Sequence, residues 1–144
     1  MNKNSFYFIV LITLNLVLSV SAQQNNKQHN CGENWQRSIE ENTLKFAGNG
    51  KMKDFYSDNE IPWKSQLQQI NKISISGISS ICQKAFQNMK VLKTIEFGNV
   101  TVIGEGAFYN TAIENLNITK SVQTIKKNAF TQNLKLKTVT FAAD

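Results

Sequence analysis

The chain has 144 residues, with 16 Lys and Arg against 10 Asp and Glu, so its formal net charge is +6 at neutral pH. It contains two cysteines and one histidine, without metal-ligand spacing, and it has no phosphate-binding glycine loop or nucleophile elbow. The carboxylates are dispersed, so none stands out as half of a catalytic pair. The sequence therefore predicts no enzyme, no metal site and no cofactor.

Residues 1–22 are typical of a secretory signal peptide. A short basic start precedes an apolar run from Phe6 to Val20, and Val20-Ser21-Ala22 offers small residues for cleavage. The run is shorter than the ~20 apolar residues of a spanning helix, and no later segment is apolar enough to span a membrane. We therefore predict cleavage of residues 1–22 rather than an uncleaved anchor, and a product that is secreted or held on the cell surface.

Residues 23–30 are a polar, Asn- and Gln-rich leader that cannot bury a core, and we predict that they are disordered. Residues 31–69 lack the repeats described below. Within them, Trp35 to Ile39 and Thr43 to Phe46 have strand-like composition and are joined by Glu40-Glu41-Asn42, which predicts a β-hairpin. Because a stack of repeats shows an apolar end to water, we predict that residues 31–69 form an N-terminal cap.

Residues 70–144 contain a short pattern that returns at a constant interval. Ile-x-x-x-Ala-Phe occurs at 81–86, 103–108 and 125–130. A fixed period in the low twenties predicts a stacked repeat protein, because each unit is too small to bury its own apolar face. We expect a mostly β solenoid of three full repeats plus a final strand, in which Phe86, Phe108 and Phe130 stack as a core ladder.

A second pattern predicts one strand per repeat, at 70–75, 92–97, 113–118 and 136–141. The last two apolar residues of each segment are two apart, so they point to the same side of a strand. The residues between them then face outward together and form a shallow polar sheet. We consider this face the candidate ligand-binding surface, with an ordinary solvated face as the alternative. The predicted face consists of Lys72, Ser74, Ser76, Thr94, Glu96, Gly98, Asn115, Asn117, Thr119, Thr138, Thr140 and Ala142.

These segments carry a family resemblance. The order Cys31-Gly32-Glu33-Asn34-Trp35, then Thr43 to Met52, then Ile61-Pro62-Trp63, then the Ala-Phe repeats resembles the BspA-type leucine-rich repeat proteins, which are surface and secreted proteins of bacteria and parasitic protists. The resemblance extends from Cys31 to Phe141 and implies a role in adhesion to host matrix or to other cells. Many members of the family are much longer.

The chain departs from the Ile-Gly of the resembling repeats at two positions. Ile-Gly is kept at Ile103-Gly104, but Cys82 and Lys126 replace the glycine in the flanking repeats. If the turn there requires a positive φ, we expect backbone strain at Cys82 and Lys126.

Two sequons and two cysteines are candidate modification sites. Asn99-Val100-Thr101 and Asn117-Ile118-Thr119 match the N-glycosylation pattern, although Asn99 also has the position of a leucine-rich repeat asparagine that bonds backbone inside a turn. Cys31 and Cys82 are either one disulfide that pins the cap to the first repeat or two thiols. His29 lies in the polar leader without an orienting group, so we interpret Cys31 as structural.

Two functions from different classes remain open. One is a secreted or cell-surface binding module for a protein or glycan. The other is a structural unit, or a fragment of a longer surface protein, that self-associates through its final coil, where Val139 and Phe141 are poorly covered. The repeats are basic, which favours anionic partners, but their lysines are scattered and no aromatic residues lie between them, so we predict no nucleic-acid binding.

Overall fold

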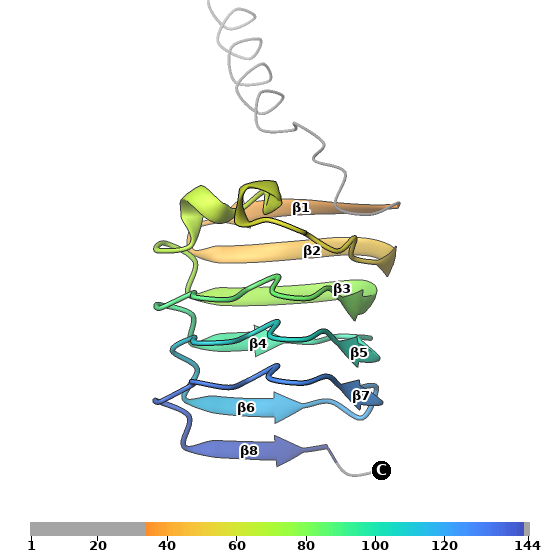
Figure 1. Cartoon of the computed structure of the whole chain (residues 1–144). Helices are drawn as coiled ribbons and strands as arrows, with labels where there is room; N and C mark the ends of the chain where they lie inside the picture. Colours follow the sequence, from red (N-terminus) through yellow and green to blue (C-terminus); the bar gives the residue numbers. More distant parts are fainter. Residues whose placement is uncertain (1–33, 143–144) are drawn as a thin grey trace, which may run out of the picture.

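The computed structural model describes residues 34–142, which form a mostly β, repeat-containing structure. Short strands lie one below another in successive layers (Figure 1). Two single turns of 3-10 helix, Asp58–Glu60 and Lys64–Gln66, cover the upper end, and no α-helix occurs between residues 34 and 142. The predicted signal peptide, the polar leader and Cys31 lie outside the described residues.

The first two strands form an antiparallel pair. β1 (Trp35–Glu40) and β2 (Thr43–Lys51) meet at Glu40 and Thr43 across a two-residue turn, where Glu41 has a φ of 52°. The other edge of β2 pairs in parallel with β3 (Lys72–Ile81). This second pairing joins the N-terminal region to the sheet of the repeats.

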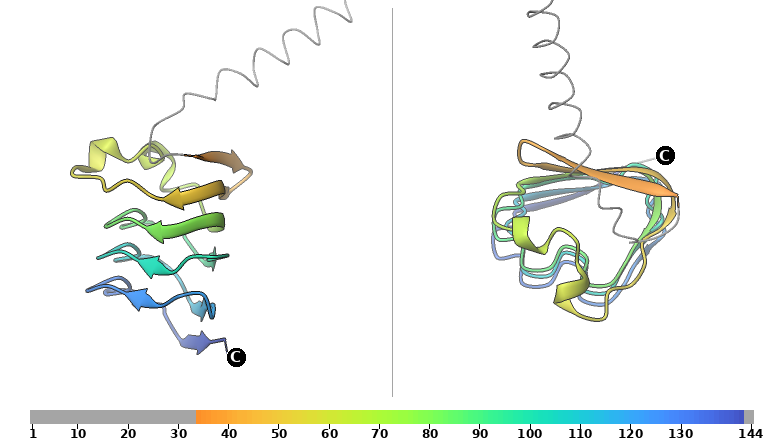
Figure 2. Two further views of the ribbon diagram at one scale, coloured as in Figure 1. Left: turned by 90° about the vertical axis from the view of Figure 1, so that its right-hand side faces the viewer. Right: turned by 90° about the horizontal axis from the view of Figure 1, so that it is seen from above.

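Parallel pairs connect each repeat to the next. β3 pairs with β4 (Thr94–Glu96), and the end of β3 pairs with β5 (Val102–Ile103), which pairs with β7 (Thr124–Ile125). Partners in these three pairs are 22 positions apart. β6 (Asn115–Ile118) pairs with β8 (Thr138–Phe141) at an offset of 23. Seen from above, the layers lie over one another (Figure 2).

The strands that carry the predicted outward polar residues begin later than the apolar pattern predicts. Ile70, Leu92 and Ile113 open the pattern, but each lies in the turn before its strand. All three are buried, with at most 1% of their surface exposed. They therefore fill the core at the corner of a layer and leave only the last residues of each segment to the sheet.

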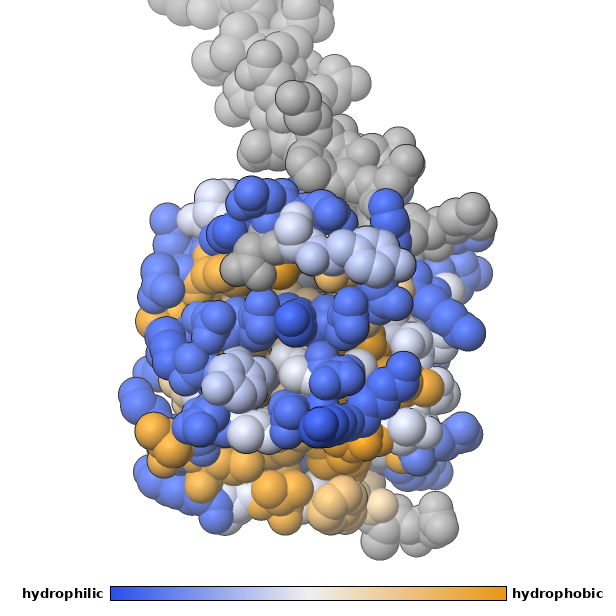
Figure 3. All heavy atoms as spheres, in the orientation of Figure 1, coloured by the Kyte–Doolittle hydropathy of each residue, from blue (hydrophilic) through white to orange (hydrophobic). Residues whose placement is uncertain are grey.

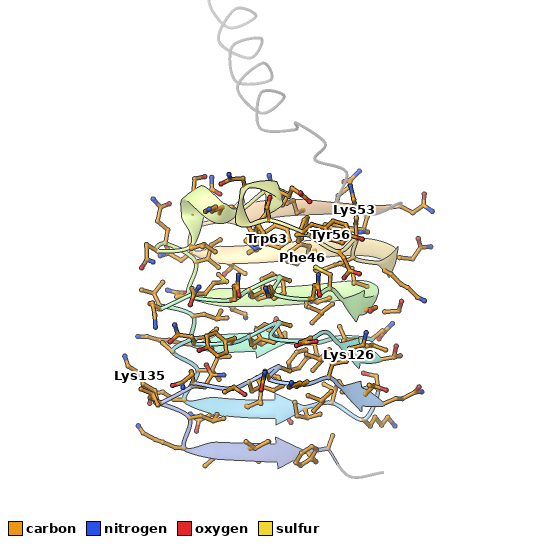
Figure 4. The ribbon with its side chains drawn as sticks, viewed as in Figure 1. Phe46, Lys53, Tyr56, Trp63, Lys126 and Lys135 are labelled. Carbon is orange, nitrogen blue, oxygen red and sulfur yellow. The ribbon has the colours of Figure 1, made fainter. Side chains whose placement is uncertain are left out.

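The aromatic ladder predicted from the repeats is confirmed. Phe86 stacks on Phe108 with ring centroids 5.1 Å apart, and Phe108 stacks on Phe130 at 5.4 Å. Trp63 continues the ladder upward, 5.4 Å from Phe86, and its indole N–H donates to the carbonyl of Ala85 at 2.9 Å. Figure 4 shows Trp63 beside Phe46 at the level of β2. The upper end of the ladder is thus covered by aromatic side chains.

Strain at Cys82 and Lys126 was expected only if the turn there required a positive φ, and the positive φ angles occur two residues later. They are found at Lys84 (55°), Gly106 (59°) and Asn128 (57°), which share one column of the stack. At position 104 glycine is required by space and not by a positive φ. A Cβ there would lie 2.6 Å from the backbone of Cys82 in the layer above. The glycine allows two layers to approach closely, and the condition for strain at Cys82 and Lys126, a positive φ, is not met.

Candidate functional site

The predicted polar residues lie on one face of the strands. In β4 and β6 the exposed positions alternate with buried Ile95, Leu116 and Ile118. The first two outward residues of β3, Lys72 and Ser74, lie opposite the two of β4, and those of β6 lie opposite those of β8. The paired outward residues are Lys72 with Thr94, Ser74 with Glu96, Asn115 with Thr138, and Asn117 with Thr140.

Four further predicted positions continue this face past the paired residues. Ser76 is exposed within β3, Gly98 is exposed just after β4, Thr119 is half-buried just after β6, and Ala142 is exposed just after β8. We call the whole set the polar face. It presents hydroxyl, amide and charged groups and no aromatic side chain.

Hydrogen bonds hold the lower half of the polar face in place. The Thr138 hydroxyl donates to Asn115 Oδ1 at 2.6 Å, and the Thr140 hydroxyl donates to Asn117 Oδ1 at 3.3 Å. The side-chain oxygens of both asparagines are therefore engaged, while their amide N–H groups are left to donate outward. Such fixed donors cost less conformational entropy on binding than mobile side chains do.

An ion pair organises the upper half. Lys72 Nζ lies 2.6 Å from Glu96 Oε1, across β3 and β4, with both side chains partly exposed. The hydrogen bond from Lys72, followed by one from Ser74, holds the pKa of the Glu96 carboxyl below its ordinary value. The face therefore carries a fixed positive and a fixed negative group side by side, with little net charge.

Residues of the N-terminal hairpin also belong to this surface, which the sequence analysis missed. Thr43, Lys45 and Ala47 lie opposite Lys72, Ser74 and Ser76 in the parallel pair of β2 and β3. Lys45 forms an ion pair with Glu40 of β1. The alternation of Thr43-Leu44-Lys45-Phe46 indicated a strand. It did not indicate that the edge of this strand away from β1 would pair with β3.

The polar face contains a seam. β4 and β6 are in contact but are not paired, and they belong to separate sheets of the described chain. Equivalent residues of these strands, such as Thr94 and Asn115, are 21 positions apart rather than 22. At this level the Ser121 hydroxyl donates across the seam to the carbonyl of Gly98 at 3.0 Å.

The modification candidates lie in different surroundings. Asn99 is exposed in the turn after β4, and Val100 fills the interior instead, so the interpretation of Asn99 as a buried turn asparagine is wrong. Asn117 is exposed on the polar face itself. Cys82 is buried, with 3% of its surface exposed, and its pairing with Cys31 stays a prediction because Cys31 is outside the described residues.

Asn133 clamps two layers together on the turn side of the stack, which is the side that carries the Ala-Phe segments. Nothing in the repeat pattern indicated this role. Asn133 Oδ1 accepts hydrogen bonds from the backbone N–H and the hydroxyl of Thr111, at 2.7 and 2.6 Å. Its side-chain amide donates to the carbonyls of Phe108 and Phe130 at 3.0 and 2.8 Å. All of these are local backbone or interlayer contacts, so Asn133 has a structural role.

The described part of the chain, residues 34–142, contains neither a metal-binding cluster nor a membrane-spanning helix. No group of three or more His, Cys, Asp and Glu side chains is placed to hold a metal ion there. The same residues contain no helix with the length and apolar character needed to cross a bilayer.

Comparisons with known proteins identify the repeats. Residues 60–144, more than half of the chain, match the family described as BspA type leucine-rich repeat region (6 copies). The fold is similar to the crystal structure of a leucine-rich repeat protein from Eubacterium ventriosum, with 19% sequence identity and a TM-score of 0.45. That similarity covers 79% of this chain and 43% of the other. No curated protein matches the chain.

Proposed function

Since this chain belongs to the BspA-type leucine-rich repeat family, we propose that it is a secreted or cell-surface module that binds a protein through the polar face and serves in adhesion. Leucine-rich repeat modules of this kind bind proteins, and proteins of this family are typically found at the surface or secreted. The signal peptide proposed for residues 1–22 supports export. The observation that carries the proposal is the polar face, with its paired and exposed outward residues.

We further propose that the layers form a short solenoid with a period in the low twenties, capped by the hairpin of β1 and β2. The support is the nearly constant offset between parallel partners, such as Lys72 with Thr94, Val102 with Thr124 and Asn115 with Thr138. The apolar side chains of β2, Leu44 and Phe46, are almost fully buried against the first repeat. A first repeat without such cover would expose the same apolar surface that the last one does.

The chemistry of the polar face favours many modest hydrogen bonds over one dominant anchor. Tight interfaces usually centre on a buried Trp, Tyr or Arg, and the polar face has none of these. A ligand would meet the amide N–H groups of Asn115 and Asn117, the Lys72 and Glu96 pair, and several hydroxyls. This pattern complements the backbone and polar side chains of another protein, and repeated contacts on a crowded surface would raise the avidity.

The experiment is a binding screen of the protein against matrix proteins, with a glycan array as a separate arm. The test variant changes Thr94→Ala, Glu96→Gln and Asn115→Ala together, at the centre of the face. The matched control changes Thr131→Ala, Glu105→Gln and Asn59→Ala, three exposed residues of the same types outside the polar face. We expect the test variant to lose binding to a protein ligand and the control to keep it.

Three results would contradict the proposal. One is equal binding by the two variants, which would place the ligand elsewhere on the molecule. The second is binding to glycans alone, which would change the class of ligand. The third is no binding to any matrix protein or glycan, which would remove the support for adhesion. Circular dichroism and urea unfolding of both variants show whether the fold is kept.

A further inference from the structure

Four lysines that are scattered along the sequence meet at one corner of the stack, where the chain passes from a turn into a strand of the polar face. Lys90 and Lys93 precede β4, and Lys135 and Lys137 precede β8. All four are exposed. Figure 4 places Lys135 at the left edge of the stack, and Figure 3 shows hydrophilic side chains projecting from that edge at successive levels. We call these four residues the basic corner.

Backbone hydrogen bonds stack this part of the chain into a column. The Asn71 N–H donates to the carbonyl of Asn42 at 2.9 Å, the Lys93 N–H to that of Asn71 at 2.8 Å, and the Lys137 N–H to that of Glu114 at 2.8 Å. Each of these residues comes just before the strand of its own layer. Because neighbouring strands are about 4.8 Å apart, Lys93 and Lys137, two layers from one another, lie roughly 10 Å apart along the stack.

A single acid lies between these lysines. Glu114 Oε2 is 2.8 Å from Lys137 Nζ. The hydrogen bond and the charge of Lys137, followed by the charges of Lys135 and Lys93, hold the pKa of the Glu114 carboxyl below its ordinary value. Three ammonium groups therefore lie close enough to act on one carboxylate. Lys93 and Lys135 form no ion pair with a residue between 34 and 142, so their charges are available to a ligand.

Lys90 adds a fourth cation on the turn side of the column. Its ammonium group donates to Asn110 Oδ1 in the layer below. The side-chain amide of Asn110 in turn donates to Asn88 Oδ1 at 2.7 Å. An ammonium group has three donors, so this bond positions the head of Lys90 and leaves two donors for a ligand.

We propose that the basic corner binds a linear sulfated polysaccharide, which lies along the stack and meets ammonium groups at successive levels. A Lys ammonium is a compact charge whose rotatable donors suit sulfate oxygens. None of the residues of the column or the corner is aromatic, so the corner lacks the usual anchor of a tight protein interface and the stacking platform that nucleic-acid bases require. The proposal does not rest on the function proposed for the polar face, because none of the four lysines belongs to that face.

An exposed apolar side chain, Leu134, lies at the same corner. It is 89% exposed, and it follows Asn133 as Lys90 follows Met89, so that Leu134 and Lys90 occupy equivalent outward positions. One leucine among lysines would suit an anionic lipid surface, but lasting attachment to a membrane takes a larger apolar face. Positive charge that extends over several layers therefore favours the polysaccharide, and an anionic vesicle is the contrasting ligand in the test.

Surface plasmon resonance on immobilised heparin tests the proposal with protein purified from expression of the complete chain. We expect binding that weakens as the salt concentration rises, because salt screens exposed charges and competes with the release of counterions from a polyanion. Desulfated heparin, which keeps its carboxylates, should bind at least about tenfold more weakly. Glu114→Gln should bind heparin about threefold more tightly, because it removes the acid of the column and releases Lys137.

Two variants with the same loss of charge separate position from overall charge. The test variant combines Lys90→Gln, Lys93→Gln and Lys135→Gln, and it should bind heparin about tenfold more weakly. The matched control combines Lys120→Gln, Lys126→Gln and Lys127→Gln, three exposed lysines outside the corner. Figure 4 places Lys126 at the side of the stack opposite Lys135. The control should change the dissociation constant by less than about threefold, and urea unfolding of both variants shows that they fold.

Several outcomes would overturn the proposal. Equal weakening by the two variants would mean that overall charge, and not the corner, attracts heparin. The absence of heparin binding at low salt, equal binding of desulfated heparin, or weaker binding by Glu114→Gln would also contradict it. Vesicles of phosphatidylserine and phosphatidylcholine form the last arm. If they bind more tightly than heparin and the test variant abolishes that binding, the corner is a site for a membrane and not for a polysaccharide.

Discussion

The aromatic ladder predicts a graded cost of truncation along the stack. Phe108 is fully buried, stacks on Phe86 and Phe130 at 5.1 and 5.4 Å, and meets Phe97 edge-on at 5.8 Å. Removing a buried Phe side chain costs about 3–5 kcal/mol, and the rigid layers on either side leave little room for collapse. Phe130 is half-buried and stacks on one ring only. We therefore expect Phe108→Ala to cost about 4 kcal/mol and Phe130→Ala about half of that.

Urea unfolding at low protein concentration measures both losses. With a slope of about 2 kcal/mol per molar urea, Phe108→Ala should lower the unfolding midpoint by about 2 M and Phe130→Ala by about 1 M. Tyr56→Ala is the control, because this ring is 82% exposed and its removal should change stability by less than about 0.5 kcal/mol. Equal losses at Phe108 and Phe130 would refute the reasoning, since they would mean that ring position in the stack does not set its contribution.

Two other predictions concern the clamp and the ion pair. Asn133→Ala should lower the free energy of unfolding by about 2–4 kcal/mol, because it removes four hydrogen bonds and leaves the buried Thr111 without a partner. Urea unfolding measures the loss, with Asn99→Ala in an exposed turn as the control. Similar losses of stability in the two variants would contradict the clamp. Glu96 has a folded-state pKa below its ordinary value, held there by Lys72, so its contribution is present at neutral pH and is lost as the pH falls through that lowered pKa. Because the pair is partly exposed, the effect should be under about 1 kcal/mol. Stability measured from pH 7 to pH 3 should fall slightly more for the unmodified chain than for Glu96→Gln, and parallel curves would argue against it.

The repeat pattern predicted what depends on local periodicity. The Ala-Phe step places one ring in each layer, so the ladder of Phe86, Phe108 and Phe130 followed directly from the spacing. Alternation of polar and apolar residues also placed Asn115 and Asn117 on an exposed surface. Both inferences need only the side-chain direction of a strand and the requirement that apolar groups be buried.

Features that depend on contacts between layers were not predictable in the same way. Asn133 occupies the position that Met89 and Thr111 occupy in the two layers above, where both side chains are buried. Its four hydrogen bonds form only because neighbouring layers bring their polar groups within reach. The exposed position of Asn99 depends on how the turn after β4 directs Val100 inward. The positive φ angles at Lys84 and Asn128 could not be located from the sequence, because the glycine at 104 reflects the close approach of two layers and not a positive φ.

The seam between β4 and β6 is a break in the backbone pairing of the polar face. Layers on either side of it remain tied on the turn side, where Phe108 N–H donates to Ala129, and through the parallel pair of β5 and β7. At this level the strands of the polar face lack backbone pairing, although the layers are bonded elsewhere. A ligand that spans the seam would therefore join two strands that no ladder of backbone hydrogen bonds holds together, and its contacts would add the link that the sheet lacks.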